Sequence, residues 1–527
     1  MRNALLGCVG LLCAIGLTGC TLGASRQASA TPTAPSTAPP AFFDIPGDPG
    51  TFRSALCPFV LPEDLRQGVE VECGYLSVRE RRGTEGGASQ GRVILLAVAI
   101  FHPPGGVTHP DPVIFLAGGP GASALEPMRY QFDVMSEPVF ATGRDLVVFD
   151  QRGVGLSRPA LDCPTYDDLA LELIDREIGG RSVSDEEVAE LVMGALRTCR
   201  DELAAVADLS AYNSAASAAD VEDLRLALGY DSVNLWGGSY GTRLALEVMR
   251  RYPSGLRSVV LDAVYPPDVD LYVQAPANFE RALERLFEAC AANAVCSVAH
   301  PGLRATFFET VAHLNAEPVL LESEDPISGE SRRTWINGNT LMALTFQLLY
   351  DSRLRYLLPE QFAAASQGDY RAFEQAIAAL VRMASISSRG MMLSVQCHEE
   401  VAFSSFEAFQ AEVARHPDVA GIYPNSLLGG LAYRVCQEWG AGRAGASDNQ
   451  AVSSDVPTLL MAGEFDPITP PAWAQGAAAA LANAYVYEYP GVGHGASALP
   501  GCPQKMFVAF LENPLSPPDD ACLAGMQ

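Results

Sequence analysis

The sequence predicts an α/β protein with a doubly wound, mostly parallel sheet and an inserted helical cap. Apolar runs of strand length alternate with amphipathic helical segments, which is typical of a parallel sheet with helices on both faces. A strand passes through a glycine-rich turn into a helix within residues 232–253. The strand pattern fades between about 268 and 450 and returns near residue 458, which indicates an insertion into one sheet.

The first predicted elements are three buried strands. They cover residues 92–101, 112–119 and 145–150, and each is bounded by Gly, Pro or Asp. Their unbroken apolar character favours a sheet covered on both faces. Two amphipathic helices follow at 184–205 and 217–230, where apolar residues recur at spacings of three and four.

The second half supplies the remaining strands. SVNLWGGSYG leads into the helix TRLALEVMRRYP, and SVVLDAVYPP, TLLMAGEFDPITP and AYVYEYPGVGHG each contain a further strand. Helical segments such as FERALERLFEAC and LMALTFQLLY fill the stretch between SVVLDAVYPP and TLLMAGEFDPITP. A separate C-terminal domain is the alternative to a cap, but the returning strands favour one sheet.

These patterns give five segments. They are a signal peptide (1–20), a Pro-, Ala-, Ser- and Thr-rich linker (21–50), the first part of the core (51–267), the cap (268–450) and the C-terminal part of the core (451–527). With 527 residues, 48% of them hydrophobic, the chain can bury a large core. Its net charge of -27 would repel nucleic acid and anionic membranes, so we expect neither as a partner.

The first twenty residues have the composition of an export signal. Arg2 precedes an apolar run that is too short for a stable membrane-spanning helix. The ending Leu17-Thr18-Gly19-Cys20 resembles the lipobox of bacterial lipoproteins, which implies a lipid tether on Cys20 as the one membrane contact. The expected location is the cell envelope, at the outer membrane or in the periplasm. A plain secretory peptide cut near Ala30 is the alternative.

Ten cysteines remain after the first twenty residues, an even number that favours disulfides in an exported protein. Local pairing in chain order is the simplest arrangement, although sequence alone leaves the connectivity open. The expected pairs are 57 with 73, 163 with 199, 290 with 296, 397 with 436 and 502 with 522.

We expect no metal or other cofactor, because metal-ligand spacings such as Cys-x-x-Cys are absent from the sequence.

A nucleophile is predicted at Ser239. It is the serine of Gly237-Gly238-Ser239-Tyr240-Gly241, a G-x-S-x-G pattern between a strand and a helix, where a sharp turn presents the hydroxyl above the sheet. Such a serine needs a histidine to accept its proton. Of the seven histidines, His494 follows a late strand in the expected chain order, whereas the others lie before the nucleophile or in the predicted cap.

The acid that orients the histidine is predicted to be Asp466. It follows the strand 458–463 on a loop fixed by Pro-Ile-Thr-Pro. A buried carboxylate there would select the useful imidazole tautomer and stabilise the charge that develops on the ring. Asp262, at the end of an earlier strand, is the rival candidate, and Glu464 is a weaker one.

An oxyanion-binding loop is predicted directly after the second strand. Leu116-Ala117-Gly118-Gly119-Pro120-Gly121 occupies the place where backbone N–H groups approach a substrate, and glycine permits that approach. We expect Gly118 or Gly119 to supply one donor and the N–H of Tyr240 the other. A structural turn is the alternative.

Three motifs together resemble the proline iminopeptidase and tripeptidyl aminopeptidase branch of the α/β hydrolases. They are AGGPG (117–121), FDQRGVGLS (149–157) and GGSYG (237–241), in the family's order and at comparable spacing. The segment from AGEFDPITP to GHG also resembles secreted tripeptidyl aminopeptidases. Ala117 replaces the family's usual histidine, which puts the packing of the oxyanion loop in doubt. We expect Asp150 and Arg152 to stabilise the loops.

The resemblance implies an α/β-hydrolase fold and acyl transfer to water from the N-terminal end of peptides. Such an enzyme must bind a free ammonium group, and a carboxylate in the cap could pair with it. Glu399 is the first candidate and Glu400 the second; a solvated helix face is the alternative for both. We expect a monomer that acts on peptides. A carboxylic ester or lactone hydrolase, and a binding protein with an inactive scaffold, are the competing functions.

Overall fold

The computed structural model describes residues 47–82, 91–175, 177–178, 181–324, 331–373, 376–377 and 387–526. The expected signal peptide with Cys20, and the linker as far as residue 46, lie outside these ranges. Residues 48–527 form one compact unit. None of the helices in the described part is both long and apolar enough to cross a membrane.

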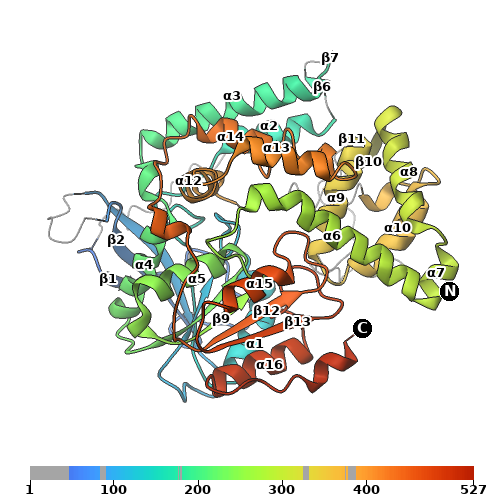
Figure 1. Cartoon of the computed structure of the whole chain (residues 1–527). Helices are drawn as coiled ribbons and strands as arrows, with labels where there is room; N and C mark the ends of the chain where they lie inside the picture. Colours follow the sequence, from blue (N-terminus) through green and yellow to red (C-terminus); the bar gives the residue numbers. More distant parts are fainter. Residues whose placement is uncertain are drawn as a thin grey trace, which may run out of the picture. The chain divides into compact units, whose positions relative to one another are not determined.

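The core is a nine-stranded sheet with the order β1-β2-β3-β5-β4-β8-β9-β12-β13 (Figure 1). The first four neighbours pair antiparallel, and every pairing from β5 to β13 is parallel. The predicted mostly parallel sheet is thereby confirmed. The strands are β1 (Thr51–Ser54), β2 (Val71–Arg79), β3 (Val93–Phe101), β4 (Val113–Leu116), β5 (Leu146–Phe149), β8 (Val233–Gly238), β9 (Leu256–Asp262), β12 (Thr458–Gly463) and β13 (Ala484–Tyr489).

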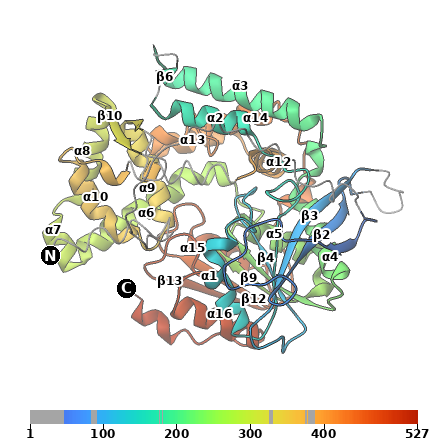
Figure 2. The ribbon, with the colours of Figure 1, turned by 180° about the vertical axis from the view of Figure 1, so that it is seen from behind.

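Helices cover both faces of the sheet. Alternate strand residues pack against α4, α5 and α15 in one apolar core, which explains the unbroken hydrophobic runs. On the other face, Trp236 of β8 contacts Phe507 of α16, and α16 contacts α1 (Figure 2). The helices are α1 (Met128–Phe140), α4 (Ser214–Ala227), α5 (Tyr240–Arg251), α15 (Pro471–Ala478) and α16 (Cys502–Glu512).

The segment between β9 and β12 forms a largely helical layer with its own apolar core. Figures 1 and 2 show it on one side of the sheet. It also contains a two-stranded sheet of β10 (Val319–Glu324) and β11 (Ser331–Ile336), which the sequence analysis missed. The helices are α6 (Leu271–Ala292), α7 (Ala294–Ala299), α8 (Leu303–Ala316), α9 (Gly338–Tyr350), α10 (Leu358–Ala365), α12 (Arg389–Glu399), α13 (Phe406–Arg415) and α14 (Gly430–Cys436).

This helical layer also draws on residues that precede the nucleophile. The helix α3 (Asp185–Ala204) contacts α12 and α14, and α2 (Pro164–Glu172) packs beside α3. A short hairpin of β6 (Glu177–Ile178) and β7 (Arg181–Ser182) lies between α2 and α3 in the chain. The layer is therefore built from two stretches of sequence.

Five disulfides join the cysteines in the expected chain order. They are Cys57–Cys73, Cys163–Cys199, Cys290–Cys296, Cys397–Cys436 and Cys502–Cys522. Each bond crosslinks segments close in sequence, so none connects the core to the cap. Five disulfides are typical of a protein that matures in an oxidising compartment outside the cytosol.

Candidate active site

The carboxyl ends of the parallel strands bring the predicted catalytic residues to one edge of the sheet. Ser239 directly follows β8, and Asp262 is the last residue of β9. Asp466 lies three residues beyond β12, and His494 lies five residues beyond β13. Ligand sites of open α/β sheets form at this edge, because loops from neighbouring strands meet there.

The backbone at Ser239 is strained. Its φ of 55° and ψ of -124° are unusual for a residue with a side chain and cost about 1–3 kcal/mol. The turn is fixed by hydrogen bonds: the Ser239 N–H donates to the Asp262 carbonyl at 2.9 Å, and the Thr242 hydroxyl donates to the Ser239 carbonyl at 2.6 Å. At Gly241 a side chain would overlap the Leu116 carbonyl oxygen, so glycine is required there. This is the turn expected of a nucleophile.

His494 and Asp466 form a buried pair. The Asp466 Oδ2 lies 2.8 Å from His494 Nδ1, and the aspartate is fully buried. Its carboxylate also accepts hydrogen bonds from the N–H groups of Ile468 and Thr469 at 3.0 and 2.9 Å, and from the Thr469 hydroxyl at 2.6 Å. Since Nδ1 faces the carboxylate, Nε2 is the ring nitrogen that remains to accept a proton from another group.

The two rival acids have other partners. The Asp262 carboxylate accepts hydrogen bonds from the N–H groups of Ala496 and Ser497, both at 2.8 Å. Glu464 accepts from the Gly491 N–H at 2.9 Å and pairs with Arg285. Asp262 therefore fixes the loop that follows His494, while its carbonyl fixes Ser239, so one residue links the nucleophile turn to the histidine loop.

The charges around the imidazole favour its protonated form. Burial lowers the pKa of His494, but the charge and hydrogen bond of Asp466, together with the charge of Asp262, raise the pKa above its usual value of 6.5. Burial also raises the pKa of Asp262, against the hydrogen bonds from Ser497. An imidazole in this environment can take up a proton during a reaction at a low electrostatic cost.

The predicted oxyanion loop contacts the nucleophile turn. A side chain at Gly118 would lie 2.9 Å from the Gly238 carbonyl oxygen and 2.9 Å from Ser239 Cβ, which shows how closely the loop approaches. The Ala117 carbonyl accepts a hydrogen bond from Gln151 at 3.0 Å. Gly119 has a positive φ and precedes Pro120 in a cis peptide bond. Tyr240 is the first residue of α5, so its N–H lies at the positive end of the helix dipole.

Asp150 stabilises the segments before and after it, as expected, and Arg152 joins its own loop to α4. The Asp150 carboxylate is fully buried and accepts hydrogen bonds from the N–H groups of Ala124, Leu125 and Leu156. Burial raises its pKa to about 6. Arg152 is also fully buried, and its Nε donates to Asp220 at 2.7 Å.

Glu399 and Glu400 are buried, so the alternative of a solvated helix face is wrong. Their side chains lie beside Arg243 of α5, which pairs with Glu400 at 2.7 Å and approaches Glu399 at 3.7 Å. The Glu399 carboxylate also accepts hydrogen bonds from the N–H and the hydroxyl of Ser214 at 3.0 and 2.8 Å. Burial raises the pKa of Glu400 to about 7, against the charge of Arg243.

Three further residues of this region, Tyr350, Ser214 and Arg243, carry no signal in the sequence. Tyr350, the last residue of α9, accepts the His494 N–H on its carbonyl at 2.9 Å, and the centroids of the two rings are 4.5 Å apart. Ser214 and Arg243 contact Glu399, as described above. No local pattern could have found them, because they lie in ordinary helical stretches and act through contacts between distant segments. Thr469, whose hydroxyl donates to Asp466, was not predicted either, although it lies in the Asp-Pro-Ile-Thr-Pro loop of the predicted acid.

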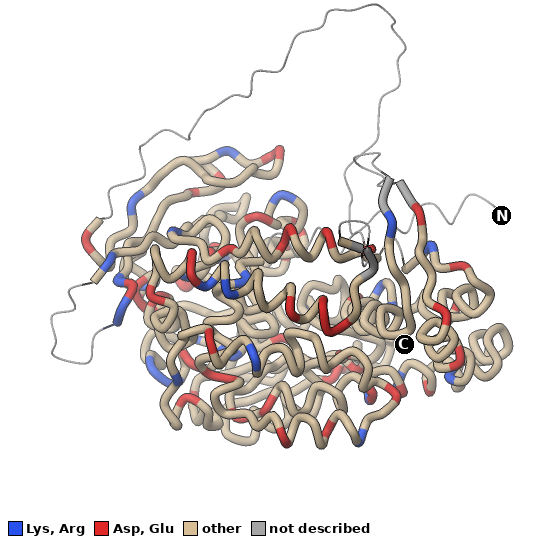
Figure 3. Tube along the Cα trace, turned by 90° about the horizontal axis from the view of Figure 1, so that it is seen from above, with Lys and Arg blue, Asp and Glu red and all other residues tan. Residues whose placement is uncertain are grey.

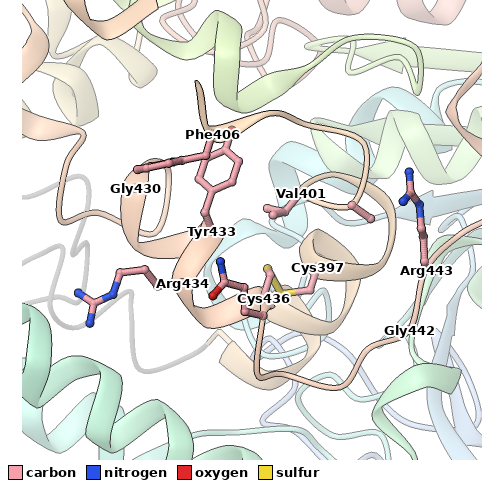
Figure 4. A pocket seen from close by; sticks show the side chains of 11 residues that line it. Cys397, Val401, Phe406, Gly430, Tyr433, Arg434, Cys436, Gly442 and Arg443 are labelled. Carbon is pink, nitrogen blue, oxygen red and sulfur yellow. A yellow bond between two sulfur atoms is a disulfide. The ribbon is translucent and has the colours of Figure 1, made fainter. Parts of the chain in front are cut away.

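A groove of about 450 Å³ opens elsewhere, over the Cys397–Cys436 disulfide (Figure 4). It contains none of the predicted site residues. Cys397 of α12 and Val401 of the loop after α12 line the groove. Glu399 and Glu400, which lie between them in the sequence, contact Arg243 instead. The lining residues are Cys397, Val401, Ala402, Phe406, Gly430, Tyr433, Arg434, Cys436, Gln437, Gly442 and Arg443.

Three curated proteins illustrate what the chain is similar to. It is 26% identical over 290 residues to the putative hydrolase YuaR of Escherichia coli K12, covering 53% of each chain. It is 29% identical over 226 residues to the serine protease Hip1 of Mycobacterium tuberculosis, covering 41% of each. It is 27% identical over 220 residues to a tripeptidyl aminopeptidase of Streptomyces coelicolor, covering 41% of this chain and 39% of that protein.

The matches span about half or less of these relatives' lengths. The family match is broader. Residues 111–498, well over half of the chain, match the alpha/beta hydrolase fold family, and this range contains β4 and every strand that follows it in the sheet, with all of the loops described above. The chain therefore belongs to the alpha/beta hydrolase fold family.

Proposed function

We propose that this protein is an exported serine peptidase that hydrolyses peptides from their N-terminus, with Ser239, His494 and Asp466 as its catalytic triad. The observation that carries the proposal is the pairing of His494 with Asp466 beside a strained serine turn. The hydrogen bonds of Asp262 to both the serine turn and the histidine loop support it. The printed names of two relatives, a serine protease and a tripeptidyl aminopeptidase, favour peptides as substrates.

The reaction follows from these roles. The Ser239 Oγ attacks the scissile carbonyl while His494 Nε2 accepts the hydroxyl proton, and Asp466 stabilises the resulting imidazolium. The carbonyl oxygen becomes negatively charged and accepts hydrogen bonds from the N–H groups of Tyr240 and of Gly118 or Gly119. His494 then returns the proton to the leaving amine. A water molecule then attacks the acyl-enzyme ester and gives its proton to His494, which passes a proton to Ser239 Oγ as the acid is released.

For the substrate's ammonium group we propose Glu400 as the partner. Two carboxylates face one guanidinium in this buried cluster, so a net negative charge remains when both are ionised, and an ammonium would balance it. Glu399 was the first candidate from the sequence, but its carboxylate already accepts two hydrogen bonds from Ser214.

Matched substrates test the peptidase proposal. Aminoacyl and tripeptidyl chromogenic amides with a free N-terminus should be cleaved, and N-acetylated versions should be poor substrates. Glu400→Gln should raise KM for the free amines and leave KM for blocked short esters unchanged. Equal effects on both classes would remove Glu400 as the amine partner. Turnover of blocked esters alone would indicate a carboxylic ester or lactone hydrolase instead.

The pKa of Glu400 adds a pH signature. The side chain is neutral below about 7 and charged above it. Ammonium binding should therefore weaken as pH falls through that value, and KM for free-amine amides should rise between about pH 7 and 6, where most of the amine is already protonated because its pKa is about 8. Blocked esters provide the control, since their KM should not change over the same interval.

We also propose that the protein is a cell-envelope lipoprotein tethered through Cys20. The lipobox-like ending supports this, and the five disulfides fit maturation outside the cytosol. Cys20→Ser should move the protein from the membrane fraction to the soluble fraction. Wild-type protein already in the soluble fraction would favour the plain secretory peptide.

A further inference from the structure

A buried chain of hydroxyl groups connects the proposed oxyanion donor to the cap. The Tyr240 hydroxyl lies 2.7 Å from Ser214 Oγ, and Ser214 Oγ lies 2.8 Å from Glu399 Oε1. Tyr240 begins α5, Ser214 begins α4 and Glu399 ends α12. Three helices from distant parts of the sequence thus meet at one serine, and none of the three residues is more than 4% exposed.

The direction of these hydrogen bonds is determined by chemistry. A carboxylate can only accept, so the Ser214 hydroxyl donates its proton to Glu399. The Ser214 oxygen must then accept the proton of the Tyr240 hydroxyl. The Ser214 N–H also donates to the same carboxylate oxygen at 3.0 Å. Water cannot easily replace these partners in a buried site, so the chain restricts the Tyr240 side chain to one position.

A second link lies one turn further along α5. Arg243 pairs with Glu400, and its guanidinium donates to the Glu399 main-chain carbonyl at 3.2 Å. Arg243 is only 2% exposed. The first turn of α5 is therefore attached to the end of α12 through Tyr240 and through Arg243. Because Ser239 immediately precedes this turn, its backbone strain is maintained from the cap side as well as from the sheet.

We propose that Ser214 and Glu399 are positioning residues for the reaction: through the Tyr240 side chain they fix the main-chain N–H of Tyr240 where the oxyanion forms. The inference rests on the proposed function. It assigns the cap a part in the chemical step itself, in addition to any part in substrate selection. It also separates the roles of two neighbouring glutamates, since Glu399 serves the catalytic rate and Glu400 the binding of the substrate amine.

Conservative variants test the inference with a chromogenic substrate. Ser214→Ala removes the bridging hydroxyl, Tyr240→Phe removes the group that donates to it, and Glu399→Gln keeps the shape but weakens the acceptor. Each should lower kcat about tenfold with KM nearly unchanged, which is less than the ~10²–10³-fold cost of deleting an oxyanion donor outright. The double variant of Ser214 and Tyr240 should lose no more than the worse single variant, because both act through one hydrogen bond.

The chain offers a matched control on the same helix. Ser217 is equally buried on α4, and its hydroxyl has no hydrogen-bond partner among the residues that the structure describes. Ser217→Ala should therefore keep the wild-type kcat. Melting temperatures of all variants show whether a loss of rate merely follows a loss of folded protein.

The outcomes separate this inference from the proposed function. If Ser239→Ala retains full activity, the proposed function fails. If Ser239→Ala is inactive but Ser214→Ala and Tyr240→Phe keep kcat within about twofold of wild type, only the positioning role is overturned. A rise in KM at constant kcat in the Glu399 variant would also overturn it, since that result assigns Glu399 to substrate binding.

Discussion

The three carboxylates near His494 show how the surroundings of a side chain decide its role. Asp466 faces the ring nitrogen, Asp262 accepts main-chain N–H groups of the following loop, and Glu464 pairs with an arginine at the surface of α6. All three end or follow strands at the same edge of the sheet. The hydrogen bonds of the Asp466 turn aim its carboxylate at Nδ1, so Asp466 is the one suited to stabilise an imidazolium.

The acid can be tested by replacement. Asp466→Asn keeps the size of the side chain but removes its charge and can favour the wrong imidazole tautomer. We expect kcat to fall by about 10³–10⁴ with KM nearly unchanged. Glu464→Gln is the matched control and should retain activity. A full-activity Asp466→Asn enzyme would show that another carboxylate serves His494.

The raised pKa of His494 predicts the acid limb of the pH–rate profile. Only the neutral imidazole can accept the serine proton, and the ring is protonated below its pKa. The kcat/KM should therefore fall as pH decreases, with a midpoint above the ordinary histidine value of 6.5. The residual activity of Asp466→Asn should show this midpoint at lower pH, because the charge of Asp466 raises the pKa. An unchanged midpoint would contradict the pairing.

At the scale of elements, the cap contacts every loop that carries a proposed triad residue. Arg281 of α6 donates to the main-chain carbonyls of Glu464 and Asp466 at 2.8 and 2.6 Å. The end of α9 accepts the His494 N–H, and Arg243 connects α5 to α12. The catalytic geometry therefore depends on packing between core and cap, which sit in different parts of the sequence.

Tyr350 offers a test of this dependence. Tyr350→Ala removes the ring against His494 but leaves the main-chain hydrogen bond, so the imidazole gains freedom. We expect kcat to fall about tenfold, since small displacements of a catalytic group are costly. Tyr350→Phe preserves the ring and should stay near wild type. If both variants matched wild type, the contact with α9 would have no part in orienting the histidine.

The elements that the sequence could predict are those with local signals. The strands, the turn at Ser239 and the loops of Asp466 and His494 all follow from short patterns of apolar residues, glycine and proline. The hairpin β10–β11 lacked such a signal, because polar residues occupy the end of β10 and the start of β11 and shorten both apolar runs. The partners of Glu399 could not be predicted either: they lie more than 150 positions away and meet it only after folding.

At the scale of the molecule, the fold combines separate apolar cores with short-range disulfides. One core surrounds the sheet, a second fills the cap, and a third joins α3, α12 and α14 with Tyr240. Figure 3 shows acidic residues distributed over many elements, in keeping with the net charge of -27. The third core contains Tyr240, which is bonded to Ser214 in the proposed positioning contacts. Loosening this core should therefore lower the catalytic rate.

The Cys397–Cys436 disulfide closes a loop within this third core. Replacing both cysteines with serine should lower the free energy of unfolding by about 2–4 kcal/mol, chiefly by freeing the unfolded chain. Chemical denaturation measures the loss. Replacing Cys502 and Cys522 should cost a similar amount but leave kcat intact, since that bond joins the start of α16 to the C-terminal segment and lies outside the cap. We expect kcat to fall only when Cys397 and Cys436 are replaced, because that bond holds the end of α12; equal losses of kcat in both variants would contradict this role.

The most direct test of the proposed triad is covalent labelling with a fluorophosphonate, followed by mass spectrometry of the peptides. We predict a single adduct on Ser239, its loss in Ser239→Ala, and labelling slowed by orders of magnitude in His494→Ala. Wild-type protein that stays unlabelled, an adduct on another residue, or equal labelling rates with and without His494 would contradict the account.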